Sequence, residues 1–197
     1  MVISDEVQSG LGRSGSHFWA YDRIGLAPDI VTIGKPLANG HPVSAAMTTP
    51  QTMKTFREAF EYFNTFGGNP VSAAAALSVL AVLKDEDLMA HAAATGACAL
   101  QRFQEIRHPW LADVRGAGLF FGLEFVTEDR KPATDFVADL VERMVHKGFL
   151  MNRIGRHLNT LKLRPPMPFR SENVDALVKA LCEALTEMPR PARAIKG

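Results

Sequence analysis

Short apolar runs, each closed by acids, glycine or proline, alternate with polar segments at the start of the chain. The runs span Met1–Val7, Asp29–Ile33 and Val43–Thr48, and the second is rich in β-branched residues. Apolar runs of about four to eight residues between turn signals are typical of strands covered on both faces. The pattern therefore predicts three strands of a buried sheet.

Helical spacing replaces these runs after Asn69. Asn69 is a favourable N-cap, and Pro70 loses no hydrogen bond at the first helical position. We therefore expect a helix over Val71–Leu83, with a second one from about Leu88 to Ile106.

The spacing of apolar residues changes in the remainder of the chain. Apolar residues alternate with period two over Leu119–Phe125, which predicts a half-buried strand, and recur at helical spacing over Phe136–Val145. Two short strands are expected at Phe149–Met151 and Thr160–Leu163, and Ser171 is expected to cap a final helix.

Alternation of strands and helices throughout is typical of α/β and α+β folds. We place a boundary near residue 95, where the pattern of apolar residues changes. The predicted organisation is a sheet-core segment over 1–95 and a small α+β segment over 96–197.

The composition excludes several classes of protein. Lys+Arg number 22 and Asp+Glu 21, for a formal charge of +1, whereas nucleic-acid binders usually carry a basic excess. A hydrophobic content of 47% argues against disorder. Cys98 and Cys182 make no disulfide framework, and we expect neither a signal peptide nor a membrane span. A cytoplasmic location is the expectation.

Two short motifs have interpretations that we reject. Gly10–Gly15 matches the dinucleotide pattern G-x-G-x-x-G, but Asp5 and Glu6 would repel a pyrophosphate, and bulky residues follow the last glycine. The same acid pair resembles a Walker B site, yet the chain has no matching phosphate loop. The histidines show no metal-ligand spacing, so they are interpreted as surface or turn residues and no metal is expected.

Three positions suit ligand chemistry. Lys35 follows a predicted strand in a Gly-Lys-Pro turn, where partial desolvation would suit a Schiff-base nucleophile. Thr65 lies in a glycine-rich loop before a helix N-terminus, a place that receives phosphate groups. Arg164 ends a predicted strand and could clamp a carboxylate. Each alone also fits a solvated lysine, a capping turn or a surface arginine.

Taken together and in order, these motifs resemble the class III aminotransferases, which are pyridoxal-phosphate enzymes of the aspartate-aminotransferase fold. The chain resembles their alanine–glyoxylate-aminotransferase-like branch in particular. The resemblance implies an α/β chain that forms the C-terminal part of the fold-type I structure, with the remainder of the large-domain sheet followed by a small α+β domain. The segments that carry the resemblance are 5–15, 28–36, 34–42, 62–70 and 164–166.

The resemblance also implies roles for individual residues. Lys35 would form the internal aldimine with pyridoxal 5′-phosphate and then carry a proton between the substrate Cα and C4′. Asp5 would pair with the pyridine nitrogen and keep it protonated, so that the ring acts as an electron sink. Val7 would pack on the ring, and Gln8 would hydrogen-bond near the ring's 3-oxygen.

Two further roles concern the phosphate and the substrate. Thr65 would bind the cofactor phosphate across the interface of a homodimer, and Arg164 would bind the substrate carboxylate. The implied reaction is transfer of an amino group from an amino acid or ω-amine to an oxo acid such as pyruvate or glyoxylate. Elimination of phosphate from a phosphorylated amino alcohol by a phospho-lyase stays open, as does an inactive fragment. No nucleic-acid or membrane partner is expected.

Members of this family are about twice as long as the 197 residues of this chain. The resemblance implies that an N-terminal half is absent, with the loop that normally holds the phosphate and the aromatic residue that stacks on the ring. We therefore expect the chain alone to bind the cofactor weakly and to be a poor catalyst.

Overall fold

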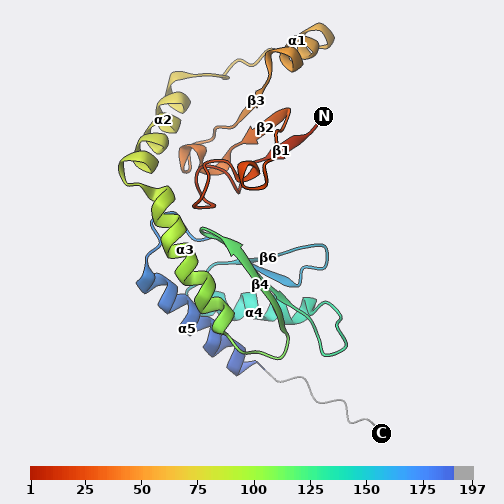
Figure 1. Cartoon of the computed structure of the whole chain (residues 1–197), viewed down its shortest axis with the longest axis vertical. Helices are drawn as coiled ribbons and strands as arrows, with labels where there is room; N and C mark the ends of the chain where they lie inside the picture. Colours follow the sequence, from red (N-terminus) through yellow and green to blue (C-terminus); the bar gives the residue numbers. More distant parts are fainter. Residues whose placement is uncertain (189–197) are drawn as a thin grey trace. The chain divides into compact units, whose positions relative to one another are not determined.

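The structure is a computed structural model that describes residues 1–188. The chain divides into two compact units, Met1–Ala94 and Thr95–Gly197 (Figure 1).

The first unit contains a three-stranded sheet in the order β1-β2-β3. Its strands are β1 (Ile3–Asp5), β2 (Ile30–Ile33) and β3 (Ala45–Thr48). β1 runs parallel to β2 with Asp5 opposite Thr32, and β3 is antiparallel to β2. The three strands predicted from the apolar runs are confirmed, with shorter bounds. Their predicted burial is wrong for β1 and β3 in this chain, because no residue of either strand is buried.

Helices connect and follow these strands. The 3-10 helices are η1 (Ala20–Ile24) and η2 (Lys35–Ala38), and the α-helices are α1 (Pro50–Ala59), α2 (Pro70–Asp85) and α3 (Leu88–Glu105). α2 and α3 agree with the helices predicted from spacing, whereas α1 was not predicted. α1 buries none of its residues, and its apolar side chains Met53 and Phe56 are exposed in this chain.

The N-terminus of α2 forms as the sequence predicts. The Asn69 side chain accepts a hydrogen bond from the Ser72 amide at 2.9 Å, and Pro70 occupies the first helical position. An amide that would otherwise lack a partner at the helix end is thereby satisfied.

A small apolar core holds the sheet of the first unit to its helices. It is built from one face of β2, the loop after β1 and η2, with partly buried side chains from α2 packed against it. Its buried members are Leu11, Val31, Ile33 and Leu37. This packing fixes the segment on either side of Lys35.

The second unit contains a four-stranded antiparallel sheet in the order β4-β5-β7-β6. The strands are β4 (Leu111–Ala117), β5 (Phe120–Phe125), β6 (Asn152–Ile154) and β7 (Thr160–Leu163). Alternate apolar residues of β5 are buried, as their period of two predicts.

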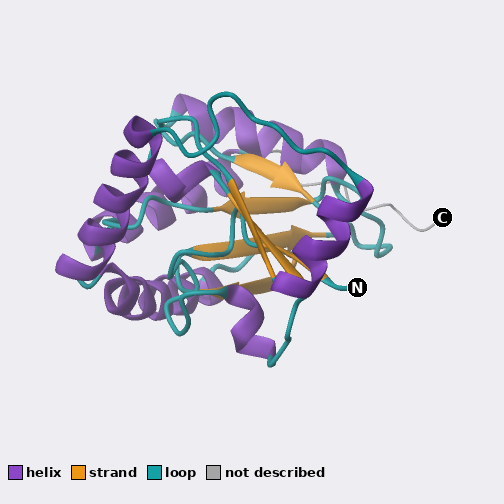
Figure 2. Cartoon of the chain, turned by 90° about the horizontal axis from the view of Figure 1, so that it is seen from above, coloured by secondary structure: helices purple, strands orange, loops and turns teal. Residues whose placement is uncertain are grey.

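Helices α4 (Thr134–His146) and α5 (Ser171–Glu187) complete the second unit. Fully buried side chains from the sheet and the helices form its core, among them Phe103, Phe125, Leu140, Leu161 and Leu181. The predicted α/β class is confirmed by this mixture of strands and helices (Figure 2).

Three details of the second unit differ from the sequence prediction. β4 was not predicted, because most of its residues are polar or small and none is buried. A strand expected at Phe149–Met151 lies three residues later, and Leu150 is 93% exposed. Ser171 is the first helical residue rather than the cap, which is Arg170.

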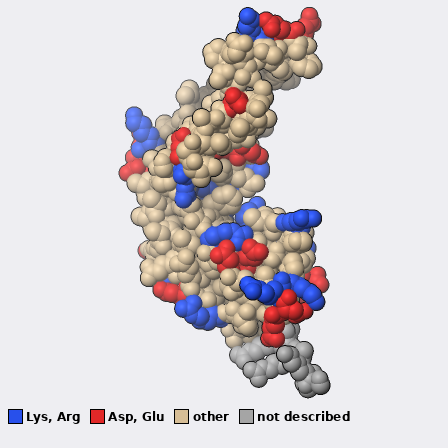
Figure 3. Space-filling view, turned by 45° about the vertical axis from the view of Figure 1, so that its right-hand side comes forward, with Lys and Arg blue, Asp and Glu red and all other residues tan. Residues whose placement is uncertain are grey.

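No helix within residues 1–188 is both long and apolar enough to cross a membrane. On the face shown in Figure 3, acidic and basic side chains are interspersed. One such cluster lies in the second unit, where the Lys147 ammonium contacts Glu187 at 2.8 Å and Glu183 at 3.4 Å.

Candidate functional site

Asp5 and Lys35 follow neighbouring parallel strands and lie at the same edge of the first sheet. Asp5 is the last residue of β1, and Lys35 follows β2 after Gly34. The amide of Glu6 donates to the Thr32 carbonyl at 2.9 Å, so the strands stay paired up to this edge. Ligands of α/β sheets bind outside the carboxyl ends of strands.

The Asp5 carboxylate is oriented by its own chain. Its Oδ1 accepts a hydrogen bond from the Val7 amide at 3.0 Å. This contact fixes the direction of the second oxygen, and the residue is exposed. Asp5 can therefore present a carboxylate oxygen to a cationic group without rearrangement.

Val7 lies beside the turn that carries Lys35. A Cβ built on Gly34 would be 3.9 Å from Val7 Cγ1, which is ordinary van der Waals contact. Val7 and Gln8 are both half-buried and belong to the turn that follows β1. The structure thus brings Val7 close to Gly34, the residue before Lys35, while Asp5 accepts from the Val7 amide and Gln8 belongs to the same turn as Val7.

The backbone at Lys35 is strained. Lys35 has a φ of 41°, in the left-handed region that residues other than glycine seldom adopt. Gly34 accepts from the Leu37 amide at 3.0 Å, and Leu37 and Ala38 are buried, which holds the turn in place. Strained residues that their surroundings hold this way cluster at functional sites. The partial desolvation expected of Lys35 is not seen, because Lys35 is exposed in this chain.

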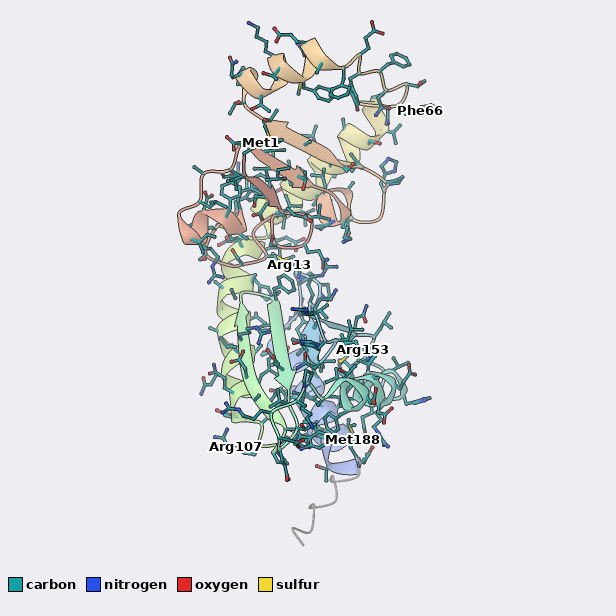
Figure 4. The ribbon with its side chains drawn as sticks, turned by 90° about the vertical axis from the view of Figure 1, so that its right-hand side faces the viewer. Met1, Arg13, Phe66, Arg107, Arg153 and Met188 are labelled. Atoms are coloured by element: carbon teal, nitrogen blue, oxygen red, sulfur yellow. The ribbon has the colours of Figure 1, made fainter. Side chains whose placement is uncertain are left out.

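Thr65 lies in an exposed turn that precedes α2. The turn is held by the Phe66 amide donating to Asn64 Oδ1 at 3.2 Å and by Asn69 Nδ2 donating to the Phe66 carbonyl at 2.9 Å. In Figure 4, Phe66 marks this turn and Arg13 marks the loop after β1. The positive end of the α2 dipole favours an anion near this turn.

A polar contact missed by sequence reasoning connects these segments. His41 Nε2 lies 2.8 Å from Ser72 Oγ, which links the turn after Lys35 to the first turn of α2. Ser72 is buried and His41 is half-buried, so His41 is not simply a surface histidine. No signal in the sequence joins two positions this far apart.

Glu6 is the second group that sequence reasoning missed. Its side chain is 2% exposed and accepts hydrogen bonds from two backbone amides and two serine hydroxyls. The signal available was its place beside Asp5, since strand alternation points consecutive side chains to opposite faces.

Rejection of the dinucleotide motif agrees with the structure. The residues after β1 form successive turns and lead to η1 rather than to an α-helix. Gly15 has a φ of 78°, and a Cβ there would lie 2.6 Å from Ala93 Cα. The glycine therefore serves a turn and close packing against α3.

Arg164 belongs to the second unit. It directly follows β7, precedes Pro165 and is half-buried. Its role as a carboxylate ligand stays a prediction.

Comparison with known proteins gives a consistent family. The model for class-III aminotransferases matches residues 1–185. Ethanolamine-phosphate phospho-lyase homolog 1 of Caenorhabditis elegans is 41% identical over 198 residues, covering 96% of this chain and 42% of that protein. Alanine–glyoxylate aminotransferase 2-like of Drosophila melanogaster is 42% identical over 193 residues, covering 94% of this chain and 39% of that protein.

Solved structures share the fold. A phospholyase from Arthrobacter in complex with phosphoethanolamine superposes with a TM-score of 0.90 and 44% identity, covering 95% of this chain and 45% of that chain. The chain thus spans less than half the length of the relatives it matches, with 42% and 39% of the two curated proteins covered.

Proposed function

Because the chain belongs to the class III aminotransferase family, we propose that it supplies the lysine and the pyridine-binding acid of a pyridoxal-phosphate-dependent transaminase. The reaction moves an amino group from an amino acid or ω-amine to an oxo acid such as pyruvate or glyoxylate. The observation that carries the proposal is the placement of Asp5 and Lys35 at one edge of two parallel strands.

The residues at this edge fit pyridoxal phosphate chemically. The cofactor supplies an electron-withdrawing ring that accepts the electron pair released when the substrate Cα loses a proton. A carboxylate such as Asp5 matches a protonated pyridine nitrogen, and the Val7 side chain beside Gly34 offers an apolar surface for a ring face. An amine at Lys35 matches an aldehyde.

Lys35 has two roles in this proposal. Its amine would hold the cofactor covalently and, once freed by the amino donor, would take up and return the proton of the substrate Cα. Lys35 has a left-handed backbone conformation, and the buried side chain of Leu37 keeps this backbone in place. A lysine held this way needs little reorganisation for each proton transfer.

Further residues bind the charged ends of the ligands. We assign Gln8 to the ring's 3-oxygen, Thr65 to the cofactor phosphate and Arg164 to the substrate carboxylate. The exposed turn of Thr65 ahead of α2 suits a phosphate that is shared with a second subunit of a homodimer.

Phosphate elimination is the second candidate. It is favoured by the 44% identity to the Arthrobacter phospholyase, whose structure contains phosphoethanolamine. The same lysine and acid would serve, because both reactions begin with loss of a proton from the carbon that bears the amine. In this case Arg164 would meet a phosphate instead of a carboxylate.

The two candidates are separated by their products. The protein is incubated with pyridoxal phosphate and either alanine plus glyoxylate or phosphoethanolamine. Formation of pyruvate and glycine in the first mixture supports transamination, whereas release of inorganic phosphate in the second supports the lyase. Because the chain alone is expected to be a poor catalyst, the decisive sample is one extended by the N-terminal half that the longer relatives have. If that sample has the cofactor bound at Lys35 and forms neither product, both candidates are contradicted.

A further inference from the structure

Glu6 is a buried carboxylate for which the proposed reaction has no direct use. Oε1 accepts from the Tyr21 amide at 3.0 Å and from the Ser4 hydroxyl at 3.0 Å. Oε2 accepts from the Ala20 amide at 3.0 Å and from the Ser9 hydroxyl at 3.1 Å. Each oxygen thus receives one backbone amide and one hydroxyl, which is the satisfaction that a buried carboxylate needs.

These contacts close a loop onto the end of β1. Ala20 and Tyr21 begin η1 and lie 14 and 15 residues from Glu6 in sequence. The backbone of Glu6 also takes part, because its carbonyl accepts from the Gly10 amide at 3.0 Å. A Cβ on Gly10 would come within 2.9 Å of that carbonyl oxygen. The loop is therefore wrapped closely around the Glu6 side chain.

The negative charge of Glu6 affects the pKa of Tyr21. The pKa of the Tyr21 phenol is raised, first by burial and then by the charges of Asp22 and Glu6. The carboxylates of Asp22 and Glu6 thus both disfavour ionisation of Tyr21, whose amide Glu6 binds.

Glu6 separates the two residues that we assign to the pyridine ring. Asp5 and Val7 flank it in sequence, and the Val7 amide donates to Asp5 Oδ1 at 3.0 Å. That contact needs the chain to turn at Glu6. The Glu6 carboxylate holds this turn by accepting hydrogen bonds from the Ala20 and Tyr21 amides. Loss of the Glu6 contacts would release the turn and, with it, the Asp5 carboxylate.

We propose that Glu6 is a positioning residue that holds the Asp5 carboxylate and the Val7 side chain in the arrangement that pyridoxal phosphate requires. This inference rests on the proposed function for its purpose. Its geometric part, that Glu6 controls the contact between Asp5 and Val7, holds for the chain without any cofactor.

Glutamine cannot replace Glu6, for a reason of hydrogen-bond chemistry. An amide group has one acceptor oxygen, and its nitrogen only donates. Each carboxylate oxygen of Glu6 now accepts from a backbone amide. Whichever way the Gln side chain is turned, the Ala20 or the Tyr21 amide loses its acceptor, whereas the serine hydroxyls can rotate.

Amide hydrogen exchange of the chain without cofactor tests the geometric part. In Glu6→Gln, exchange at Ala20 or Tyr21 and also at Val7 should quicken about 10- to 100-fold, which corresponds to losing a hydrogen bond to a charged group. In Asp5→Ala, only Val7 should quicken. Glu58→Gln, at an exposed residue of α1, is the matched control and should leave all three amides unchanged. If Glu6→Gln quickens exchange throughout the first unit, the Ser9→Ala variant is used in its place. Ser9→Ala removes one hydroxyl donor to Glu6 and leaves both backbone amides with their acceptors.

An unchanged Val7 amide in a variant whose Ala20 or Tyr21 amide has opened would overturn the inference. Cofactor titration gives the second readout. Glu6→Gln and Asp5→Ala should each weaken pyridoxal phosphate by about tenfold or more, and the double variant should bind no more weakly than Asp5→Ala alone. Additive losses would mean that Glu6 does not act through Asp5. A wild-type chain that binds no cofactor at Lys35 would count against the proposed function, and the exchange at Val7 would still decide the inference.

Discussion

His41 Nε2 lies 2.8 Å from the buried hydroxyl of Ser72, which also accepts from Asn69 Nδ2 at 3.0 Å. One serine therefore joins the turn that follows Lys35 to the cap of α2, and the turn of Thr65 lies just ahead of that cap. We infer that this hydroxyl keeps the lysine turn and the phosphate turn in a fixed relation.

Ser72→Ala should reduce the free energy of unfolding by about 1–3 kcal/mol, because it leaves polar atoms of His41 and Asn69 without their partner. Urea unfolding measures the loss. Ser78→Ala, in the same helix, is the matched control, since its hydroxyl is exposed and only bonds back to the Ala74 carbonyl. Equal losses of unfolding free energy in the two variants would contradict a structural role for Ser72.

Gly96→Ala should destabilise the second unit even though alanine favours a helix. A Cβ at Gly96 of α3 would lie 2.2 Å from the Gly118 carbonyl oxygen, and backbone atoms cannot yield as a side chain does. The clash should outweigh a helix-propensity gain of about 1 kcal/mol and leave a net loss of about 1–3 kcal/mol. Gln101→Ala, at an exposed position of α3, should change stability by less than about 0.5 kcal/mol. A stabilised Gly96→Ala would show that the two segments do not pack this closely.

The Tyr21 phenol should ionise above the ordinary value of about 10, since burial and then the charges of Asp22 and Glu6 raise its pKa. The folded chain holds this proton more tightly than the unfolded chain. The stabilising contribution is therefore present below the unfolded pKa and is lost as pH rises through the folded one. Tyrosinate absorbance in a Tyr62→Phe background isolates the group. A midpoint at or below about 10 would contradict the burial of Tyr21.

Arg164→Ala should lower kcat/KM for carboxylate substrates about 10- to 100-fold, since a hydrogen-bonded charge pair contributes about 1.5–3 kcal/mol. Covalent attachment of the cofactor at Lys35 should be unaffected. Arg156→Ala, at an exposed position of the same unit, is the control. The measurement is made in a chain extended by the N-terminal half that the longer relatives have, since the chain alone is expected to be a poor catalyst. An unaltered kcat/KM in Arg164→Ala of that enzyme would refute the assignment.

Local patterns predict elements that face a core or whose ends carry clear capping residues. β2 could be predicted because its β-branched residues agree with its burial, and α2 because Asn69 and Pro70 mark its start. α1 and β4 offered neither signal in the same degree, since α1 buries nothing and β4 exposes most of its residues.

The candidate site divides in the same way. The family resemblance assigns Asp5 and Lys35 to one cofactor, and the structure has them at the same edge of two parallel strands. The buried acceptor at Glu6 and the contact between His41 and Ser72 join residues that lie 14 or more positions apart. Only the folded chain brings these pairs together, so neither role could be predicted.

Cofactor trapping at Lys35 tests the central claim most directly. The chain is incubated with excess pyridoxal phosphate, reduced with borohydride and digested, and the labelled peptide is identified by mass spectrometry. The account predicts a label on Lys35 that disappears in Lys35→Ala, while Lys84→Ala, at an exposed lysine of α2, retains it. A label on Lys54 or Lys84 in place of Lys35, or one that persists unchanged in Lys35→Ala, would contradict it.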